Sequence, residues 1–213
     1  MRYLIWLPLW LGILGQAAAG GPETVPLPPP HTEGGMPLMQ ALKARHSSRE
    51  FAARPLPRQV LSDLLWAANG VNRPDTGKRT APTAKDMREI LVYVITAEGV
   101  HLYEPSVHAL RRVADGDLRH LAGTQDFVAQ APLNLVYVAD LGRMDTSEEN
   151  QRLYSATDTG FIAQNVYLFC ASAGLATVVR GSVDRAPLAA ALGLGPQQQI
   201  ILAQTVGYPK QAK

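Results

Sequence analysis

The sequence has few of the side chains that usually carry catalysis or bind metals. Among its 213 residues, Cys170 is the only cysteine, so no disulfide can form within the chain. The five histidines are isolated, and none stands at metal-ligand spacing from another histidine or from the cysteine, which argues against a zinc site. A Gly-x-Ser-x-Gly motif is missing, and with it the nucleophile of an α/β-hydrolase. An enzyme with this composition would need a cofactor to supply its chemistry.

The sequence also lacks a strong excess of charge of one sign. Lysine and arginine number 20 and aspartate and glutamate 18, which gives a formal net charge of +2. A surface for nucleic acid is therefore not indicated. Hydrophobic residues make up 46% of the chain, enough for one core at this length, so we expect one folded domain. Cys170 lies in an apolar helical stretch without a nearby cation, and we expect a buried structural thiol.

The longest apolar run is at the N-terminus. Residues 1–19 carry one charge at Arg2, apolar residues from Tyr3 to Leu14, and small residues up to Ala19. This layout predicts a cleavable secretory signal peptide that is cut near Ala19. The apolar run is shorter than the ~20 residues needed to cross a bilayer, although an uncleaved anchor is the alternative. We expect an exported protein, periplasmic or secreted, with no stable membrane insertion after cleavage.

The rest of the chain divides into a linker and a domain. Residues 20–35 are rich in proline and glycine and predict a linker, either a tether or an extended arm, before a domain at 36–213. The helices and strands expected there do not alternate as regular βαβ units, so the predicted fold class is an α+β sandwich. Periodicity predicts helices over 36–44, 57–68, about 148–173 and 185–192, and strands over 90–95, 100–103, 133–139, 176–179 and 200–206.

A cluster of polar and basic residues lies between the first two predicted helices. It reads Arg45-His46-Ser47-Ser48-Arg49. Guanidinium groups bind phosphate through two parallel hydrogen bonds, and a hydroxyl or a backbone N–H at the end of an element completes such a site. The cluster therefore suggests an anion clamp. The alternative is a pair of exposed charges at a helix end.

This cluster is the first of several motifs whose order and spacing resemble the nitroreductase superfamily of flavin enzymes. The likeness is greatest to the branch that contains azoline-ring dehydrogenases, although Lys85-Asp86 departs from the Gly-Ala usual in that branch. It covers about residues 37–210. The motifs are Arg45–Arg49 with Phe51, Arg79–Ala84, Leu102–Pro105 with His108–Leu110, Gly123–Phe127, Gln130–Pro132, Asp158–Gly160 with Ala163–Asn165, Gly174–Thr177 and Gly207–Pro209.

The resemblance implies an FMN-binding α/β sandwich, with a mostly antiparallel central sheet flanked by helices, that works as a homodimer with flavins in its interface. By position, the FMN phosphate and ribityl chain would be held by Arg45, His46, Ser47, Arg49 and Lys210. The flavin ring would be lined by Pro82, Thr83 and Ala84 from the partner subunit, by Gln125, and by Arg180 and Gly181 near its reactive edge. The alternatives are a solvent-facing Arg180, a capping or surface role for Gln125, and an ordinary tail charge at Lys210.

The function that the resemblance implies is an FMN-dependent oxidoreductase. It would transfer hydride or electrons to or from a small organic substrate in two half-reactions at one site, with no catalytic side chain of its own. Export makes the usual NAD(P)H donor doubtful, because nicotinamide donors are cytoplasmic. Two alternatives stay open: an exported FMN carrier or sensor without turnover, and an interaction domain that has lost the flavin.

Overall fold

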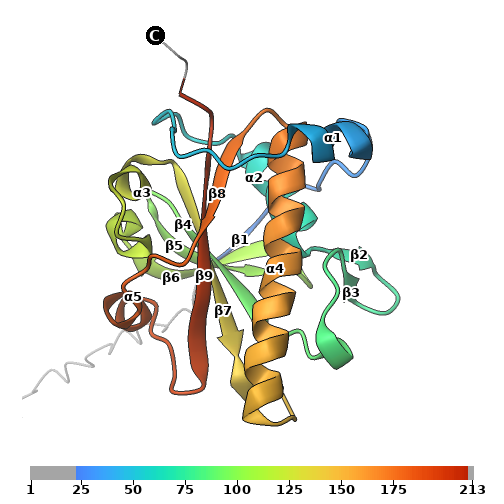
Figure 1. The fold of residues 1–213 in the computed structure, drawn as a ribbon, viewed down its shortest axis with the longest axis vertical. Helices are drawn as coiled ribbons and strands as arrows, with labels where there is room; N and C mark the ends of the chain where they lie inside the picture. The colour runs from blue at the N-terminus through green and yellow to red at the C-terminus, as the bar shows by residue number, and fades with distance from the viewer. Residues whose placement is uncertain (1–22, 211–213) are drawn as a thin grey trace, which may run out of the picture.

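The computed structural model describes residues 23–210, so the predicted signal peptide lies outside the described residues. The described chain forms a seven-stranded sheet in the order β1-β6-β5-β4-β7-β9-β8, in which all neighbours run antiparallel (Figure 1). Its strands are β1 Thr24–Pro26, β4 Ile90–Ile95, β5 Gly99–Glu104, β6 Ala109–Asp115, β7 Leu133–Asp140, β8 Ala176–Arg180 and β9 Gln198–Gly207. The helices are α1 Leu38–Ala44, α2 Arg58–Asn69, α3 Asp126–Gln130, α4 Glu148–Ser172 and α5 Arg185–Ala191.

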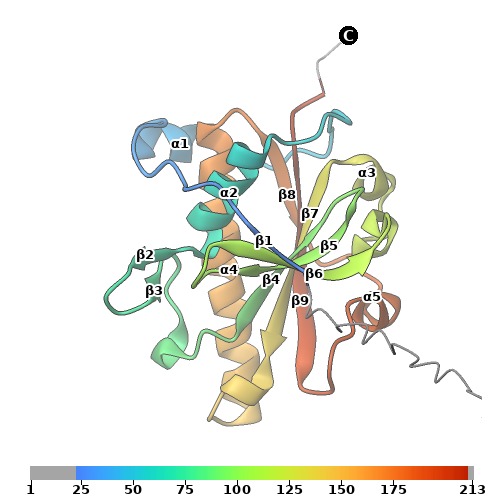
Figure 2. The same cartoon turned by 180° about the vertical axis from the view of Figure 1, so that it is seen from behind.

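Helices cover both faces of this sheet. The helices α2 and α4 pack on one face, while α3, α5 and the short turn η2 (Arg119–Ala122) cover the other (Figure 2). Strand β7 is buried from Leu133 to Ala139, which explains its near-continuous run of apolar residues. The predicted α+β sandwich with an antiparallel sheet is confirmed.

Helix α4 is the longest element of the described chain, and it connects β7 to β8. It begins after Ser147, whose hydroxyl accepts the amide hydrogen of Asn150, and Glu148 and Glu149 complement the positive end of the helix dipole. It ends before Gly174, which has the left-handed φ of 67° common after helix C-termini. Cys170 lies on its buried face and is fully covered, and this burial raises the pKa of the thiol. The predicted structural thiol is confirmed.

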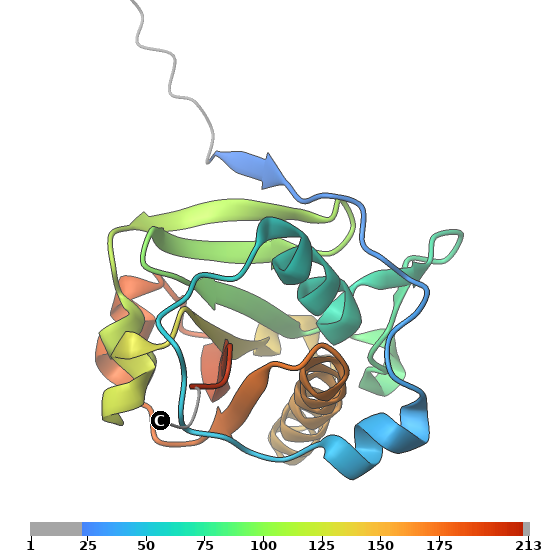
Figure 3. The same ribbon diagram turned by 90° about the horizontal axis from the view of Figure 1, so that it is seen from above.

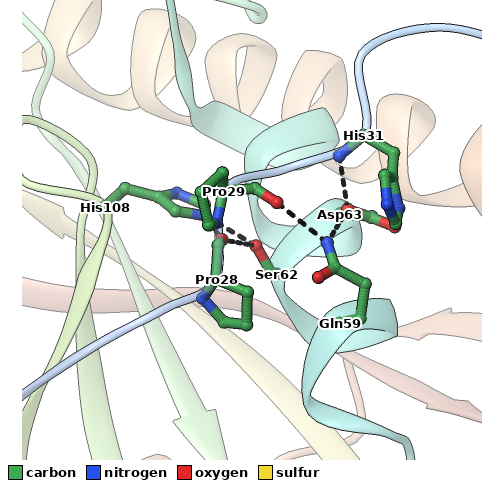
Figure 4. A network of polar contacts seen from close by, with 7 residues as sticks. All are labelled: Pro28, Pro29, His31, Gln59, Ser62, Asp63 and His108. Atoms are coloured by element: carbon green, nitrogen blue, oxygen red, sulfur yellow. Dashed lines mark hydrogen bonds and ion pairs between the residues drawn. The ribbon is translucent and has the colours of Figure 1, made fainter.

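The proline-rich segment before α1 is an extended arm. Thr24–Pro26 form the edge strand β1 against β6, and Leu27 is buried in the core (Figure 3). Pro28 and His31 are hydrogen-bonded to side chains of α2 (Figure 4). Of the two alternatives left open for residues 20–35, the extended arm is therefore the one observed for the described part.

Most predicted elements occur within about two residues of their expected bounds, and five helices or strands were missed. Strands β1 and β6 were not expected, nor was the short helix α3. Between α2 and β4, where neither a helix nor a strand was predicted, the chain forms the small hairpin of β2 (Val71–Arg73) and β3 (Lys78–Arg79). None of the helices within residues 23–210 has the length and apolar character of a membrane span.

Candidate functional site

The polar and basic cluster between α1 and α2 is held along the start of β8 and the C-terminal end of the chain (Figure 3). The amide of Ser48 donates to the carbonyl of Thr177 over 2.9 Å. Further along, Phe51 forms a bridge with Pro209, and the amide of Lys210 donates to the carbonyl of Glu50 over 3.2 Å. The fold therefore brings the backbone of Lys210 beside the segment that contains Arg49.

The side chains of this cluster are held by a tyrosine from α4. The hydroxyl of Tyr167 lies 2.8 Å from Ser47 Oγ and accepts the amide hydrogen of Val179 over 2.9 Å, while the guanidinium of Arg45 lies 5.2 Å from the centre of its ring. His46 Nδ1 lies 2.8 Å from the carbonyl of Ala44, so it carries the hydrogen and leaves Nε2 for a ligand. Sequence reasoning missed Tyr167, because only the packing of α4 against β8 brings it here.

The cations of the cluster have no counter-ion among the described residues. Within residues 23–210, none of Arg45, Arg49 and Lys210 forms an ion pair. Arg49 and Lys210 are exposed and Arg45 is half-buried. Positive groups that are held by the backbone of one short segment, and are not neutralised, are suited to an anionic ligand.

The other end of β8 holds two more of the predicted residues. The amide of Thr124 donates to the carbonyl of Ser182, which places Gln125 beside the loop that follows β8. Gln125 precedes α3 without a side-chain capping bond, so the capping alternative is wrong. A Cβ at Gly181 would meet no atom within 4 Å in the described chain, which leaves open space over the backbone there.

Of the two alternatives that the sequence left open for Arg180, the solvent-facing one is wrong, and a charge near the flavin ring stays a prediction. The side chain of Arg180 is only 4% exposed and therefore does not point to solvent. Its guanidinium donates to Thr205 Oγ1, the carbonyl of Ala122 and Asn134 Oδ1 over 3.1, 2.9 and 3.1 Å, so its donors are directed to protein acceptors. Burial lowers the pKa of Arg180 to about 10, which leaves it charged at neutral pH. Direct contact of this guanidinium with a flavin ring is therefore not what the structure supports.

The proline-containing loop at residues 82–84 lies far from the clamp within one chain. Its next residues are strained, because Lys85, Asp86 and Arg88 have φ of 51°, 58° and 53°. The loop is fixed to α4 by Asp158 Oδ2, which accepts the amide hydrogen of Ala84 over 2.8 Å. Asp158 and Tyr167 are nine residues apart, or about 13.5 Å along the helix at 1.5 Å per residue. One chain does not bring the loop and the clamp together.

The buried carboxyl group of Glu89 is hydrogen-bonded to this loop. Glu89 is fully buried, and its Oε2 accepts the hydroxyl hydrogen of Thr83 over 3.2 Å. Burial, the nearby charge of Asp158 and a hydrogen bond with that carboxyl raise the pKa of Glu89. Within the described chain, Glu89 Oε1 has no hydrogen-bond partner. Glu89 and Asp158 are 69 positions apart, so no local pattern predicts that they meet.

Apolar side chains are exposed on α1 and α4. The exposed fractions are 62% for Leu38, 76% for Met39 and 44% for Leu42 on α1, and 57% for Leu153 and 42% for Phe161 on α4. Exposed large apolar side chains on neighbouring helices are typical of protein interfaces. In the part of the chain that the structure describes, no group of three or more His, Cys, Asp or Glu side chains is placed to hold a metal ion.

Comparison with known proteins agrees with this architecture. The model of the nitroreductase family matches residues 42–208. A nitroreductase-like protein of Methanocaldococcus jannaschii is 34% identical over 156 residues, which are 68% of this chain and 78% of that protein. The crystal structure of a nitroreductase-like protein from Ralstonia eutropha superposes with a TM-score of 0.85 at 45% identity and covers 89% of this chain and 90% of that chain.

A more distant structure shares the fold. The NADPH:FMN oxidoreductase from Vibrio harveyi, complexed with NAD+, superposes with a TM-score of 0.62 at 21% identity and covers 82% of this chain and 69% of that chain. At this identity the likeness concerns the fold alone. The family match and the two closer relatives decide the assignment, and the chain belongs to the nitroreductase family.

Proposed function

We propose that the protein binds FMN and works as an oxidoreductase that transfers hydride or electrons to or from a small organic substrate. The single observation that carries the proposal is the arrangement along β8. Three cations that form no ion pair in the described part of the chain belong to the segments around Thr177, and open space lies over Gly181. Gly181 follows Thr177 by four residues, which is about 13 Å of extended chain at 3.3 Å per residue. This distance between the cations and the open space suits an elongated ligand with an anionic end.

We call the clamp together with residues 177–181 the strip along β8. Its residues match the parts of FMN. Arg45, Arg49 and Lys210 would neutralise the phosphate, and Ser47 and His46 Nε2 would bind the phosphate or the ribityl hydroxyls. The absence of a side chain at Gly181 allows a planar ring to approach the backbone closely. When bound, FMN supplies the two-electron chemistry that the side chains lack. Arg180 would act through its position rather than by contact, since it fixes Ala122 and therefore the segment that leads to Gln125.

The site is completed by a second copy of the chain. The apolar residues on α1 and α4 would be covered in a homodimer, and the loop with Pro82, Thr83 and Ala84 of the partner subunit would then close over the ring. Its exclusion of water would strengthen the electrostatic contacts inside the site. The bonds from Asp158 and Glu89 hold this loop in one conformation, which is the contribution of the protein to ring orientation.

The proposal includes a location and a relationship within the family. The signal-like N-terminus supports export, and an exported enzyme would take its electrons from a donor other than NAD(P)H. The order of the motifs supports a relationship to the azoline-dehydrogenase-like branch, while Lys85-Asp86 argues against azoline oxidation itself.

The test is flavin retention followed by turnover. The chain without residues 1–19 is incubated with FMN, passed through a desalting column and examined by absorbance. Retained flavin is expected, with an affinity about 10- to 150-fold lower in Arg49→Ala, because a hydrogen bond to a charged group contributes about 1.5–3 kcal/mol. Arg152→Ala is the matched control, since Arg152 is an exposed arginine on α4 with only a distant ion pair.

Turnover separates the enzyme from the alternatives. Bound flavin that is reduced by dithionite and reoxidised by a nitroaromatic or a quinone over many cycles supports the oxidoreductase. Retained flavin that does not react with such acceptors would favour the carrier or sensor. A colourless protein after desalting would overturn the flavin assignment altogether.

A further inference from the structure

A cavity of about 820 Å³ lies between the N-terminal arm, α2 and the sheet face that α2 covers. More than half of its lining is apolar, and these side chains come from five separate parts of the chain: Leu27 of the arm, Leu61 of α2, Val94 of β4, Leu110 of β6 and Leu133 of β7. Ligand pockets commonly measure about 300–1,000 Å³, so the volume is that of a binding site rather than a packing defect. The cavity shares no lining residue with the strip along β8.

The wall that the arm contributes is fixed in place (Figure 4). Ser62 Oγ donates to the carbonyl of Pro28 over 2.6 Å and accepts from His108 Nε2 over 2.7 Å. Because Ser62 gives its own hydrogen to that carbonyl, His108 must carry its hydrogen on Nε2, and Nδ1 then accepts from the Tyr103 hydroxyl over 2.9 Å.

Two further side chains of α2 hold the next residues of the arm. The amide of Gln59 donates to the carbonyl of Pro29 over 2.9 Å, and Asp63 accepts the backbone amide hydrogen of His31 over 2.8 Å. Together with the pairing of β1, these bonds hold the arm on both sides of Leu27. The cavity is therefore preformed in the folded chain.

Charges at the rim of the cavity balance one another. Arg119 is paired with Asp117 through two bonds of 2.8 and 2.6 Å. Arg58, which donates to the carbonyl of Pro26 and forms no ion pair within residues 23–210, and Glu98 add one charge of each sign to the lining. The pKa of Glu98 is lowered by hydrogen bonds, first from Thr96, which keeps it ionised. A ligand with a net charge of either sign would meet a like charge at the rim.

We infer that this cavity binds an uncharged lipophilic small molecule. The apolar walls supply the affinity by removing the ligand from water. The balanced rim selects against ions while it offers Thr96, His101 and Gln130 to a hydroxyl or carbonyl group of the ligand. Burial lowers the pKa of His101, so its imidazole is neutral at pH 7 and adds no charge to this selection. The site is independent of the flavin and would bind whether or not FMN is present.

The test compares two probes that differ by one sulfonate group. N-phenyl-1-naphthylamine is uncharged, and 8-anilino-1-naphthalenesulfonate carries a sulfonate on the same ring system; both become fluorescent in apolar surroundings. We expect the uncharged probe to bind with one site per chain, at least tenfold more tightly than the sulfonate. Glu98→Gln removes the negative charge from the rim and should raise the affinity for the sulfonate while that for the uncharged probe stays unchanged.

Two variants locate the binding. Leu61→Trp adds bulk from a half-buried position of α2, and Ala97→Trp adds bulk to the lining from an exposed position between β4 and β5. Each should weaken the uncharged probe at least tenfold, whereas Ala190→Trp, at an exposed alanine of α5 away from the cavity, should leave it unchanged. Flavin retention is measured on the same samples and reports the other site separately.

Three results would overturn the inference: no saturable binding of the uncharged probe below 1 mM, equal binding by the sulfonate, or binding that survives both Leu61→Trp and Ala97→Trp. The last would place the probe elsewhere, for example on the apolar side chains of α1 and α4.

Discussion

The close approach of Gly123 to Arg180 gives a prediction whose size follows from the structure. A Cβ at residue 123 would lie 1.9 Å from Arg180 Nη1 and 3.1 Å from the carbonyl oxygen of Ser182. Arg180 cannot move aside, because three protein acceptors hold its guanidinium. Gly123 has an extended φ of 172°, which other residues adopt, so the obstacle is steric and not conformational. We expect Gly123→Ala to lower the free energy of unfolding by about 2–3 kcal/mol, as overpacking does.

The cause can be isolated with a double-mutant cycle. Arg180→Met should itself cost about 3 kcal/mol, because it leaves the carbonyl of Ala122 without its donor, while Asn134 Oδ1 keeps the hydroxyl of Thr205 at 2.7 Å. In the Arg180→Met background, Gly123→Ala should cost less than about 1 kcal/mol, since the flexible methionine can yield. The expected coupling is therefore about 2 kcal/mol.

Urea unfolding of the flavin-free protein, followed by circular dichroism, measures each corner of the cycle. In thermal melts, about 2–4 °C per kcal/mol is expected for a chain of this size. Gly181→Ala is the control, because a Cβ there meets nothing within 4 Å and should change stability by less than about 0.5 kcal/mol. If Gly123→Ala costs the same in both backgrounds, contact with Arg180 is not the reason that residue 123 must be glycine.

Three further predictions concern the clamp, the arm and the buried carboxyl group. Tyr167→Phe should weaken FMN binding about fivefold by freeing Ser47, at about 1 kcal/mol per hydrogen bond, and unchanged affinity in a fluorescence titration would show that Ser47 needs no support. Burial lowers the pKa of His108, so its contribution to stability is complete above the ordinary value of about 6.5 and is lost as the pH falls toward the folded value. The protection factors of the amides in residues 23–31, which compare observed with intrinsic exchange rates and so remove the base catalysis of exchange, should then be lower at pH 5 than at pH 7.5, and this difference should be smaller in His108→Gln. The pKa of Glu89 is raised, so the contribution of Glu89 to the free energy of unfolding should fall as the pH rises above about 4.3. In urea unfolding, Glu89→Gln should remove this contribution from the slope of stability against pH, and an unchanged slope would contradict the assignment to Glu89.

The fold could be predicted where one segment carries its own signal. The apolar run of β7 and the caps of α4 are local features, and both elements were expected near their observed bounds. Strand β6 has two arginines in its centre and was missed, because its extended conformation depends on β5 and β1 rather than on its own pattern. Strand β1 contains a proline, which the sheet accepts only because β1 is at its edge.

The candidate site shows the same division. The cluster from Arg45 to Arg49 stands in one segment and could be read directly. The direction of Arg180 could not, since its acceptors Asn134 and Thr205 meet only through the register of β7 and β9. Polar residues such as Asn134 and Thr205 inside apolar strands indicate that a buried network of hydrogen bonds exists. They do not indicate which residues bond to one another.

The clamp segment also covers one edge of the sheet. At the edge strand β8, the amide of Ser48 donates to the carbonyl of Thr177, and the hydroxyl of Tyr167 accepts the amide hydrogen of Val179. At the opposite side of the sheet, β1 pairs with β6, which would otherwise be the edge strand. Unpaired strand edges promote intermolecular pairing and aggregation. The stretch that is proposed to bind the phosphate therefore also protects an edge, so variants that loosen it should lose solubility together with cofactor affinity.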